Sequence, residues 1–380
     1  MTATSAARKR TPLYTLHLER GARMVAFAGY DMPVQYPLGI LKEHLHVRAA
    51  VGLFDVSHMG QFAVRAASGN LNEVASALET LLPVDIVGLG IGRQRYALMT
   101  NEQGGIRDDL MIANMGDRFL IVANAACKDA DELHLRQALS GRCEIERLDD
   151  RALLALQGPA AEAVLSLFAP GVAAMRFMDV RRVPLLGADC VIARSGYTGE
   201  DGFEVSVPAA MAETFARKLL TDSGVAMVGL GARDSLRLEA ALCLYGADLD
   251  PSTTPVEAAL EWSIQPARRK GGSRAGGFPG AGIILEQLES GAPRRRVGLR
   301  PGGRAPIRHG TQLFPDAKFV EAVGTVTSGG FGPSVGAPVA MGYVAASDLA
   351  SPTPLFAELR GERVPVRLSK LPFIPASYKR

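Results

Sequence analysis

The stretch Asn101-Glu-Gln-Gly-Gly-Ile-Arg-Asp-Asp-Leu110 places two adjacent carboxylates directly after a glycine turn. An apolar run at 96–99 precedes the turn and another at 110–113 follows it, and each run is typical of a β-strand. The glycines therefore lie where a hairpin turn requires positive φ. We expect a β-hairpin here, with Asp108 and Asp109 at the start of its second strand.

The two carboxylates suggest acid–base chemistry. Carboxylates this close raise each other's pKa. Because side chains alternate along a strand, only one of the two needs to face a substrate. The alternative is that the pair is a solvent-exposed cap of the turn, which is the common role of Asp beside a turn.

The hairpin belongs to a longer pattern between residues 60 and 146. The order there is strand, helix 71–82, strand, strand, helix, strand, which is a ferredoxin-like order. Residues 38–50 also have a helical pattern, and the chain from 229 to 264 is expected to be mainly helical. From residue 294 onward, short β-like runs separated by Gly-Gly and Gly-Pro predict a small barrel or sandwich.

Length and composition limit the class of protein. A chain of 380 residues is too long for one ordinary core, so two or three domains are expected, and the basic, glycine-rich segment 268–279 is the best linker candidate. A net charge of +3 is too small for a nucleic-acid-binding surface. The four cysteines have no C-x-x-C spacing and are expected to be reduced, and His44 and His46 fall in a helical pattern, so no metal site is expected.

No run of 18 apolar residues occurs, so a membrane span is not expected. Residues 1–10 are basic but lack an apolar region and are short for a transit peptide. We therefore expect a cytoplasmic protein.

Other motifs combine glycine, acidic and aromatic residues in a way that few structural needs explain. They are Phe54-Asp-Val-Ser-His-Met-Gly60, Gln157-Gly-Pro159, Arg194-Ser-Gly-Tyr-Thr-Gly-Glu-Asp-Gly-Phe-Glu204, Gly229-Leu-Gly-Ala-Arg-Asp-Ser-Leu-Arg-Leu-Glu239, Leu244-Tyr-Gly-Ala-Asp-Leu-Asp250 and Thr253-Thr-Pro-Val-Glu257. With the hairpin, these motifs strongly resemble the aminomethyltransferase (T-protein) family of the glycine cleavage system, in order and over nearly the whole chain.

The resemblance implies an α+β fold, a three-domain cloverleaf ring with a ferredoxin-like insertion domain, a C-terminal β-barrel and a folate in the central hole. The expected division is a folate-binding core at 1–56 and 148–275, the ferredoxin-like domain with the Asp hairpin at 57–147, and the barrel domain at 276–380.

The resemblance also assigns roles to residues. By this resemblance Asp109 is expected to be the catalytic carboxylate, and Asp108 is then structural. Glu204 is expected to accept paired hydrogen bonds from a pterin, since a carboxylate can accept both. The other folate-binding candidates are Tyr197, Arg233, Tyr96, Met59 and Asn124.

For several of these residues an ordinary structural role is the alternative. Glu204 could be a solvated strand residue, and Tyr96 could simply fill space in a strand. Arg233 is the proposed anchor for a folate carboxylate, because Arg in the first turn of a helix is unfavourable with the helix dipole and calls for an anion. That anion could instead be Asp234 or Glu239.

The implied reaction is one-carbon transfer from an aminomethyl group on the dihydrolipoyl arm of the H-protein to tetrahydrofolate. Loss of the lipoyl sulfur leaves a methylene iminium, folate N5 attacks it, and closure through N10 releases ammonia and gives 5,10-methylenetetrahydrofolate. Asp109 would relay protons and stabilise the cation. The basic clusters 268–270 and 294–296 are candidates for docking an acidic H-protein.

Two alternatives keep the folate site. One is a non-catalytic, folate-binding accessory protein, whose relatives carry a Lys-Gly-Cys-Tyr-x-Gly-Gln-Glu-type loop where this chain has 195–204 in the catalytic form. The other is the folate module of a sarcosine or dimethylglycine demethylating system, which needs a G-x-G-x-x-G flavin motif that this chain lacks.

Overall fold

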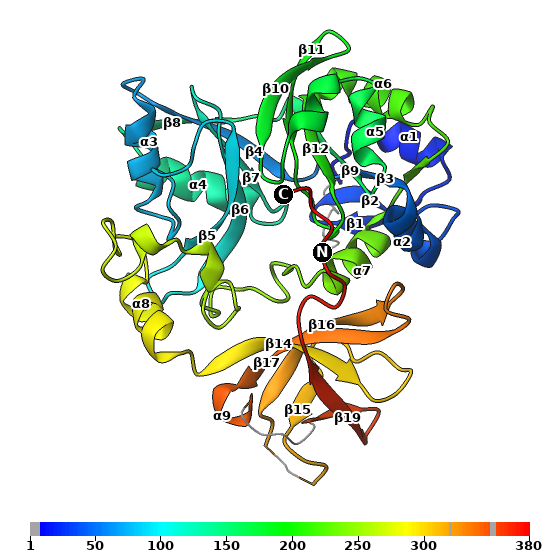
Figure 1. The fold of residues 1–380 in the computed structure, drawn as a ribbon, viewed down its shortest axis with the longest axis vertical. Helices are drawn as coiled ribbons and strands as arrows, with labels where there is room; N and C mark the ends of the chain where they lie inside the picture. The colour runs from blue at the N-terminus through cyan, green and yellow to red at the C-terminus, as the bar shows by residue number, and fades with distance from the viewer. Residues whose placement is uncertain (1–7, 319–320, 350–354) are drawn as a thin grey trace, which may run out of the picture.

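The computed structural model describes residues 8–318, 321–349 and 355–380, so residues 1–7 of the expected first domain lie outside the described part. Figure 1 shows three lobes set around a common centre, each built on its own sheet. Helices and strands are mixed in the first two lobes, and the last lobe is a closed barrel. The expected α+β architecture with a C-terminal barrel is confirmed.

The first lobe is built on a six-stranded sheet with the strand order β10-β11-β12-β9-β3-β13. The strands are β3 (Val51–Asp55), β9 (Arg151–Gln157), β10 (Val180–Leu185), β11 (Ala188–Ala193), β12 (Gly202–Pro208) and β13 (Val225–Met227). β9 is central, and after its first residue all of its side chains are buried, as its continuous apolar sequence predicts. Only β13 is parallel to its neighbour, β3.

Helices and a small hairpin complete this lobe. They are α1 (Tyr14–Glu19), the hairpin β1 (Arg23–Phe27) and β2 (Tyr30–Gln35), α2 (Ile40–Ala49), α5 (Ala161–Ser166), the short 3₁₀ helix η1 (Pro170–Ala174), α6 (Ala209–Leu219) and α7 (Leu230–Glu239). The helix expected at 38–50 is α2. None of the helices in the described residues is long and apolar enough to cross a bilayer.

The second lobe is a five-stranded antiparallel sheet with the order β5-β6-β7-β4-β8. Its elements are β4 (Gly60–Ala66), α3 (Leu71–Leu78), β5 (Arg93–Thr100), β6 (Ile106–Asn114), β7 (Phe119–Ala123), α4 (Lys128–Ala138) and β8 (Cys143–Arg147). The predicted order lacked β7, a five-residue strand that is hard to separate from β6 by pattern alone. Without the edge strand β5, the remaining order is ferredoxin-like.

Two sequence expectations differ from the structure. The α3 helix ends at Leu78 rather than residue 82, and tight turns continue to Leu82 with backbone bonds to Ala77 and Leu78. Between 241 and 260 the chain is irregular rather than helical, because Asp and Thr side chains bond the local backbone and Gly246 needs a φ of +83°.

The predicted linker at 268–279 is not a free linker. Arg268 is only 4% exposed, and its guanidinium donates to the backbone oxygens of Glu79 and Arg274. Two short 3₁₀ helices, η2 (Glu261–Ser263) and η3 (Pro266–Arg268), precede it, and α8 (Ala281–Ser290) follows it. The segment is therefore packed against the second lobe.

The third lobe is a closed barrel with the strand order β14-β17-β16-β15-β18-β19. Its elements are β14 (Arg294–Pro301), β15 (Gln312–Phe314), β16 (Gly324–Gly332), β17 (Ala337–Ala345), α9 (Ala346–Leu349), β18 (Leu355–Leu359) and β19 (Glu362–Ser369). After β19 the chain leaves the barrel and returns to the first lobe (Figure 1).

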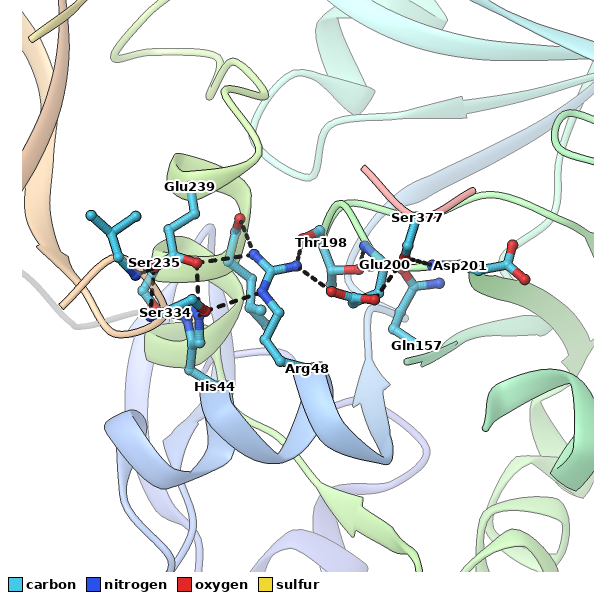
Figure 2. A network of polar contacts seen from close by, with 12 residues as sticks. His44, Arg48, Gln157, Thr198, Glu200, Asp201, Ser235, Glu239, Ser334 and Ser377 are labelled. Carbon is cyan, nitrogen blue, oxygen red and sulfur yellow. Dashed lines mark hydrogen bonds and ion pairs between the residues drawn. The ribbon is translucent and has the colours of Figure 1, made fainter. Parts of the chain in front are cut away.

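Near α7, polar contacts connect the first lobe with the barrel and with the C-terminal segment (Figure 2). Glu239 at the end of α7 bonds His44 of α2 and the backbone N–H of Ser334, in the turn between β16 and β17. Arg48 of α2 bonds Glu239 and Glu200, and Glu200 accepts a hydrogen bond from Ser377 of the C-terminal segment. The barrel and the C-terminus are thereby tied to the first lobe.

Candidate functional site

The Asp hairpin forms as predicted, with β5 and β6 paired antiparallel and the turn at 101–105. The Asn101 side chain accepts hydrogen bonds from the N–H groups of Gln103 and Gly105. A Cβ at Gly105 would lie 1.8 Å from the carbonyl oxygen of Pro251, so only glycine fits there. This close approach holds the turn against the loop that follows α7.

Asp109 is half-buried and is held by Tyr96 on the neighbouring strand and by Asn124, which directly follows β7. Tyr96 on β5 donates from its hydroxyl to Oδ2 at 3.0 Å, and Asn124 donates from Nδ2 to Oδ1 at 2.7 Å. Burial, and then the charge of Asp108, raise the pKa of Asp109 to about 7 despite these hydrogen bonds. Asp109 can therefore gain or lose a proton near neutral pH.

Asp108 points to the opposite face of β6, as strand alternation predicts, and is completely buried. It accepts hydrogen bonds from the backbone N–H of Asn124 at 3.1 Å and from Asn124 Nδ2 at 2.8 Å. The solvent-exposed capping role is thereby excluded for Asp108. Asn124 joins the two carboxylates, which sequence reasoning had not foreseen.

Tyr197 and Arg233 contact each other. The guanidinium of Arg233 lies over the Tyr197 ring, 4.7 Å from its centre, and the Tyr197 hydroxyl donates to the backbone oxygen of Cys243. Burial raises the pKa of Tyr197, and the charge of Asp109 adds to this effect against that of Arg237. This aromatic ring therefore lies within electrostatic range of Asp109, although it comes from a different lobe.

In the described residues Arg233 forms no salt bridge with an acidic side chain. Asp234 pairs with Arg237, and Glu239 pairs with His44 and Arg48, so neither of the anions considered from sequence neutralises Arg233. Its Nη1 is buried and bonds no acceptor in the described residues. Burial lowers its pKa, and only the charge of Glu204 and the Tyr197 phenol oppose this. The guanidinium is available to an anionic or carbonyl ligand.

Glu204 lies on β12, and its Oε2 accepts a hydrogen bond of 2.8 Å from the hydroxyl of Ser195, which precedes this strand. The Glu204 side chain is only partly buried. Ser195 belongs to the same glycine-rich motif, so the motif both supplies the carboxylate and orients it.

Tyr96 stacks on Trp262 of η2, with ring centres 5.5 Å apart and an angle of 25° between the planes. Trp262 is 60% exposed, so this stack presents an apolar face to solvent beside Asp109. Sequence reasoning missed Trp262, and its only signal was that it is the single tryptophan of the chain.

Met59 has a less distinctive environment than the other candidates. It packs, partly buried, against an apolar cluster that includes Phe54 and Leu236. The structure thus brings Tyr96, Asp109 and Asn124 into direct contact. Tyr197, Arg233 and Glu204 form a second group, and within it Tyr197 is affected by the charge of Asp109.

Taken together, the lobes and the site define a class of protein. Residues 13–268 match the family model described as the GCVT N-terminal domain, and residues 294–374 match the glycine cleavage T-protein C-terminal barrel domain. The chain belongs to the glycine cleavage T-protein family.

Individual relatives agree over nearly the full length. The chain is 42% identical to the mitochondrial aminomethyltransferase of Dictyostelium discoideum, over 98% of this chain and 94% of the relative. It is 43% identical to that of Gallus gallus, over 97% and 93%. A crystal structure of the glycine cleavage system aminomethyltransferase T from Bartonella henselae matches with a TM-score of 0.90 and 46% identity, covering 98% of this chain and all of that one.

One expectation needs correction, and a second is narrowed. The curated relatives are named as mitochondrial proteins, so the cytoplasmic expectation is contradicted. Within the two basic clusters, Arg268 and Arg296 are buried and cannot contact a partner, so any docking there stays a prediction for the other members. Of their neighbours, Lys270 pairs with Glu289, Arg294 with Glu257 and Arg295 with Glu261.

Proposed function

We propose that this chain is the aminomethyltransferase of the glycine cleavage system. It transfers the methylene carbon of the aminomethyl group on the dihydrolipoyl arm of the H-protein to tetrahydrofolate, which gives 5,10-methylenetetrahydrofolate and ammonia. The observation that carries the assignment of its chemistry is the environment of Asp109. A carboxyl group with a pKa of about 7, held by Tyr96 and Asn124, is suited to proton transfer at neutral pH.

The residues around Asp109 fit a folate. The unsatisfied Nη1 of Arg233 can bind a carboxylate or a carbonyl oxygen, and the carboxylate of Glu204 can accept two parallel N–H bonds from a pterin. The stacked pair of Tyr96 and Trp262 offers a flat apolar surface for an aromatic ring. Tyr197 is proposed to line the same cavity, as are Met59 and Asn124.

Tetrahydrofolate supplies the two amines, N5 and N10, between which the transferred carbon is finally held. In its ionised form Asp109 accepts a proton from the reacting amine and stabilises positive charge that develops near it. Tyr96 and Asn124 each donate to one oxygen of Asp109, which fixes the plane of the carboxylate. The partner that delivers the carbon is the lipoylated H-protein.

We also propose the domain division at 1–56 with 148–275, 57–147, and 276–380. Each of the three units contains one of the three large sheets, which supports this division. On this division the residues of the proposed site come from the first two units.

Two measurements test the function. Isothermal titration with tetrahydrofolate should show binding, and addition of H-protein loaded with the aminomethyl group should release ammonia and form methylenetetrahydrofolate in equal amounts. Folate binding without ammonia release would favour a non-catalytic accessory protein. Release of formaldehyde from sarcosine or dimethylglycine would favour a demethylating system.

A further inference from the structure

Asp108, the neighbour of Asp109, forms a second pair of buried carboxyl groups with Asp131. The proposed reaction does not use this pair. Asp108 is fully buried on β6, and Asp131 in the first turn of α4 is 3% exposed. The two side chains lie within range of each other, so Asp108 contributes to a raised pKa of Asp131. In residues 8–318, 321–349 and 355–380, neither carboxyl group is in a salt bridge with a lysine or arginine.

Two buried carboxyl groups this close, without a paired cation, cannot both be ionised at low cost. One proton between them removes the repulsion and supplies a donor for a hydrogen bond between them. The surrounding donors indicate which group carries the charge. Asp108 accepts two hydrogen bonds from Asn124, whereas Oδ2 of Asp131 is buried and accepts none in the described residues. The proton therefore lies on Asp131, and the negative charge lies on Asp108.

We propose that Asp131 is a positioning residue for proton transfer: protonated, it donates to Asp108, keeps the negative charge there, and through this charge controls the protonation of Asp109. The proposal rests on the proposed function of Asp109. The structural link is the amide of Asn124, whose Nδ2 lies 2.8 Å from Asp108 Oδ1 and 2.7 Å from Asp109 Oδ1. A single amide group thus orients both carboxylates.

The other titratable groups around Asp131 do not supply a neutralising charge. Burial, and then Asp108 and Asp109, raise the pKa of Asp131 well above its usual range, and the exposed Arg107 opposes them. Burial raises the pKa of the Cys127 thiol and of the Tyr245 phenol, so both stay neutral.

The titratable side chains around Asp109 are also mostly neutral, which leaves Asp108 as the main charge that acts on Asp109. Burial raises the pKa values of Tyr96, Tyr197 and Cys243, so these three groups are uncharged at neutral pH. After burial, the charge of Asp108 is the largest cause of the raised pKa of Asp109.

The first test compares two substitutions of Asp131 by the pH dependence of kcat/KM with aminomethyl-loaded H-protein. Asp131→Asn mimics the protonated acid and still donates to Asp108, so the acidic midpoint should stay within about 0.3 pH unit of wild type. Asp131→Leu removes the donor that stabilises the negative charge beside Asp109, so the midpoint should fall by about one pH unit. Asp129→Asn on the same helix is the control, because Asp129 is exposed and paired with Arg147.

The outcomes are separable. If Asp131→Asn lowers the midpoint as far as Asp131→Leu does, Asp131 is ionised and the proposal is wrong. If neither variant moves the midpoint, Asp131 has no influence on Asp109 and the proposal is equally wrong.

A second measurement does not need activity. Carbon-13 NMR of the wild-type protein labelled at Asp carboxyl carbons should show one carboxyl group that remains protonated at pH 7.5, and this signal should be absent from Asp131→Asn. If wild type shows no such signal, the shared proton does not exist. If the signal is present but no ammonia is released, the proposed function fails while the acid pair remains.

Discussion

Asp109 combines a half-buried position, two donors and a nearby anion, and each of these has a measurable consequence. The carboxylate form is needed to accept a proton, and the pKa of Asp109 is about 7. In the wild-type protein kcat/KM should therefore rise with pH through about 7. Asp109→Asn should lower kcat by at least ~10²-fold and abolish this rise.

The same substitution should not destabilise the fold. Since the pKa of Asp109 is higher in the folded than in the unfolded state, its ionisation costs stability as the pH rises from about 4 through 7. The Tm of Asp109→Asn at pH 8 should equal or exceed that of wild type. Glu102→Gln, at the exposed turn of the same hairpin, is the control for both measurements. Turnover within a few-fold of wild type would remove Asp109 from the chemistry.

Glu204 should determine folate affinity rather than stability. Glu204→Gln keeps the shape and an acceptor for the Ser195 hydroxyl, but the amide cannot accept two parallel N–H bonds. Loss of a charged hydrogen-bonded pair costs about 2–3 kcal/mol, so the Kd for tetrahydrofolate in isothermal titration should rise roughly 30-fold or more. The Tm without ligand should barely change. An unaltered Kd, equal to that of the exposed variant Glu144→Gln on β8, would place Glu204 outside the site.

Arg233 should contribute to folate binding but little to the stability of the fold. Its guanidinium has a buried Nη1 without an acceptor, so Arg233→Met removes an unsatisfied donor at the cost of the contact with the Tyr197 ring. Without ligand, the free energy of unfolding should stay within about 1 kcal/mol of wild type, while the Kd for tetrahydrofolate rises at least ~10-fold. Arg367→Met, exposed on β19, is the control. A large loss of stability with an unchanged Kd would make Arg233 a purely structural residue.

At the scale of elements, the hairpin of β5 and β6 depends on its contact with the loop after α7. The N–H of Ile106 donates to the backbone oxygens of Asp250 and Thr253, and Asn101 Nδ2 donates to that of Pro251. Because these bonds come from residues about 150 positions apart, the turn is positioned by another part of the chain.

Gly105→Ala tests that contact. The added methyl group would overlap the Pro251 carbonyl oxygen, and such overpacking costs about 1–3 kcal/mol. We expect a lower Tm in a thermal scan and a lower kcat, because the displaced hairpin carries Asp109. Gly171→Ala is the matched control, since a Cβ at Gly171 meets no atom within 4 Å. Equal Tm values for the two variants would show that the hairpin adapts without cost.

At the scale of the whole molecule, the C-terminal segment connects the barrel with the first lobe. The Ser377 hydroxyl donates to Glu200, the Tyr378 ring stacks on Phe177 at 4.0 Å, and Lys379 pairs with Glu162. Glu200 lies in the motif that contains Tyr197 and Glu204. The segment therefore supports the proposed folate loop from outside the first lobe.

Removal of residues 377–380 should weaken both the fold and folate binding. It deletes the stack, the ion pair and the Ser377 bonds, so the Tm should fall by about 5 °C or more. The Kd for tetrahydrofolate should rise because the loop at 194–204 loses its support. Lys370→Ala, exposed just after β19, should change neither value. A truncated protein with wild-type affinity would show that the loop holds its shape alone.

The sequence by itself determined the features that depend on neighbouring residues. The Asp hairpin, the α2 helix, the buried β9 strand and the C-terminal barrel all follow from local periodicity and turn residues. The family resemblance added the ring architecture, which periodicity could not supply. The helical expectation for 241–260 was wrong because side-chain bonds to the local backbone, together with Gly246, compete with helix formation there.

Only the tertiary structure decided which residues meet across long separations in the chain. Trp262 stacks on Tyr96 although 166 positions separate them, and Arg233 lacks the partners that its own helix offered. Asp131 reaches Asp108 because α4 packs across the sheet, and that contact leaves one proton between two buried acids. Such pairings depend on how separate elements pack and on the low polarity this creates, and neither is encoded in the spacing of residues along the chain.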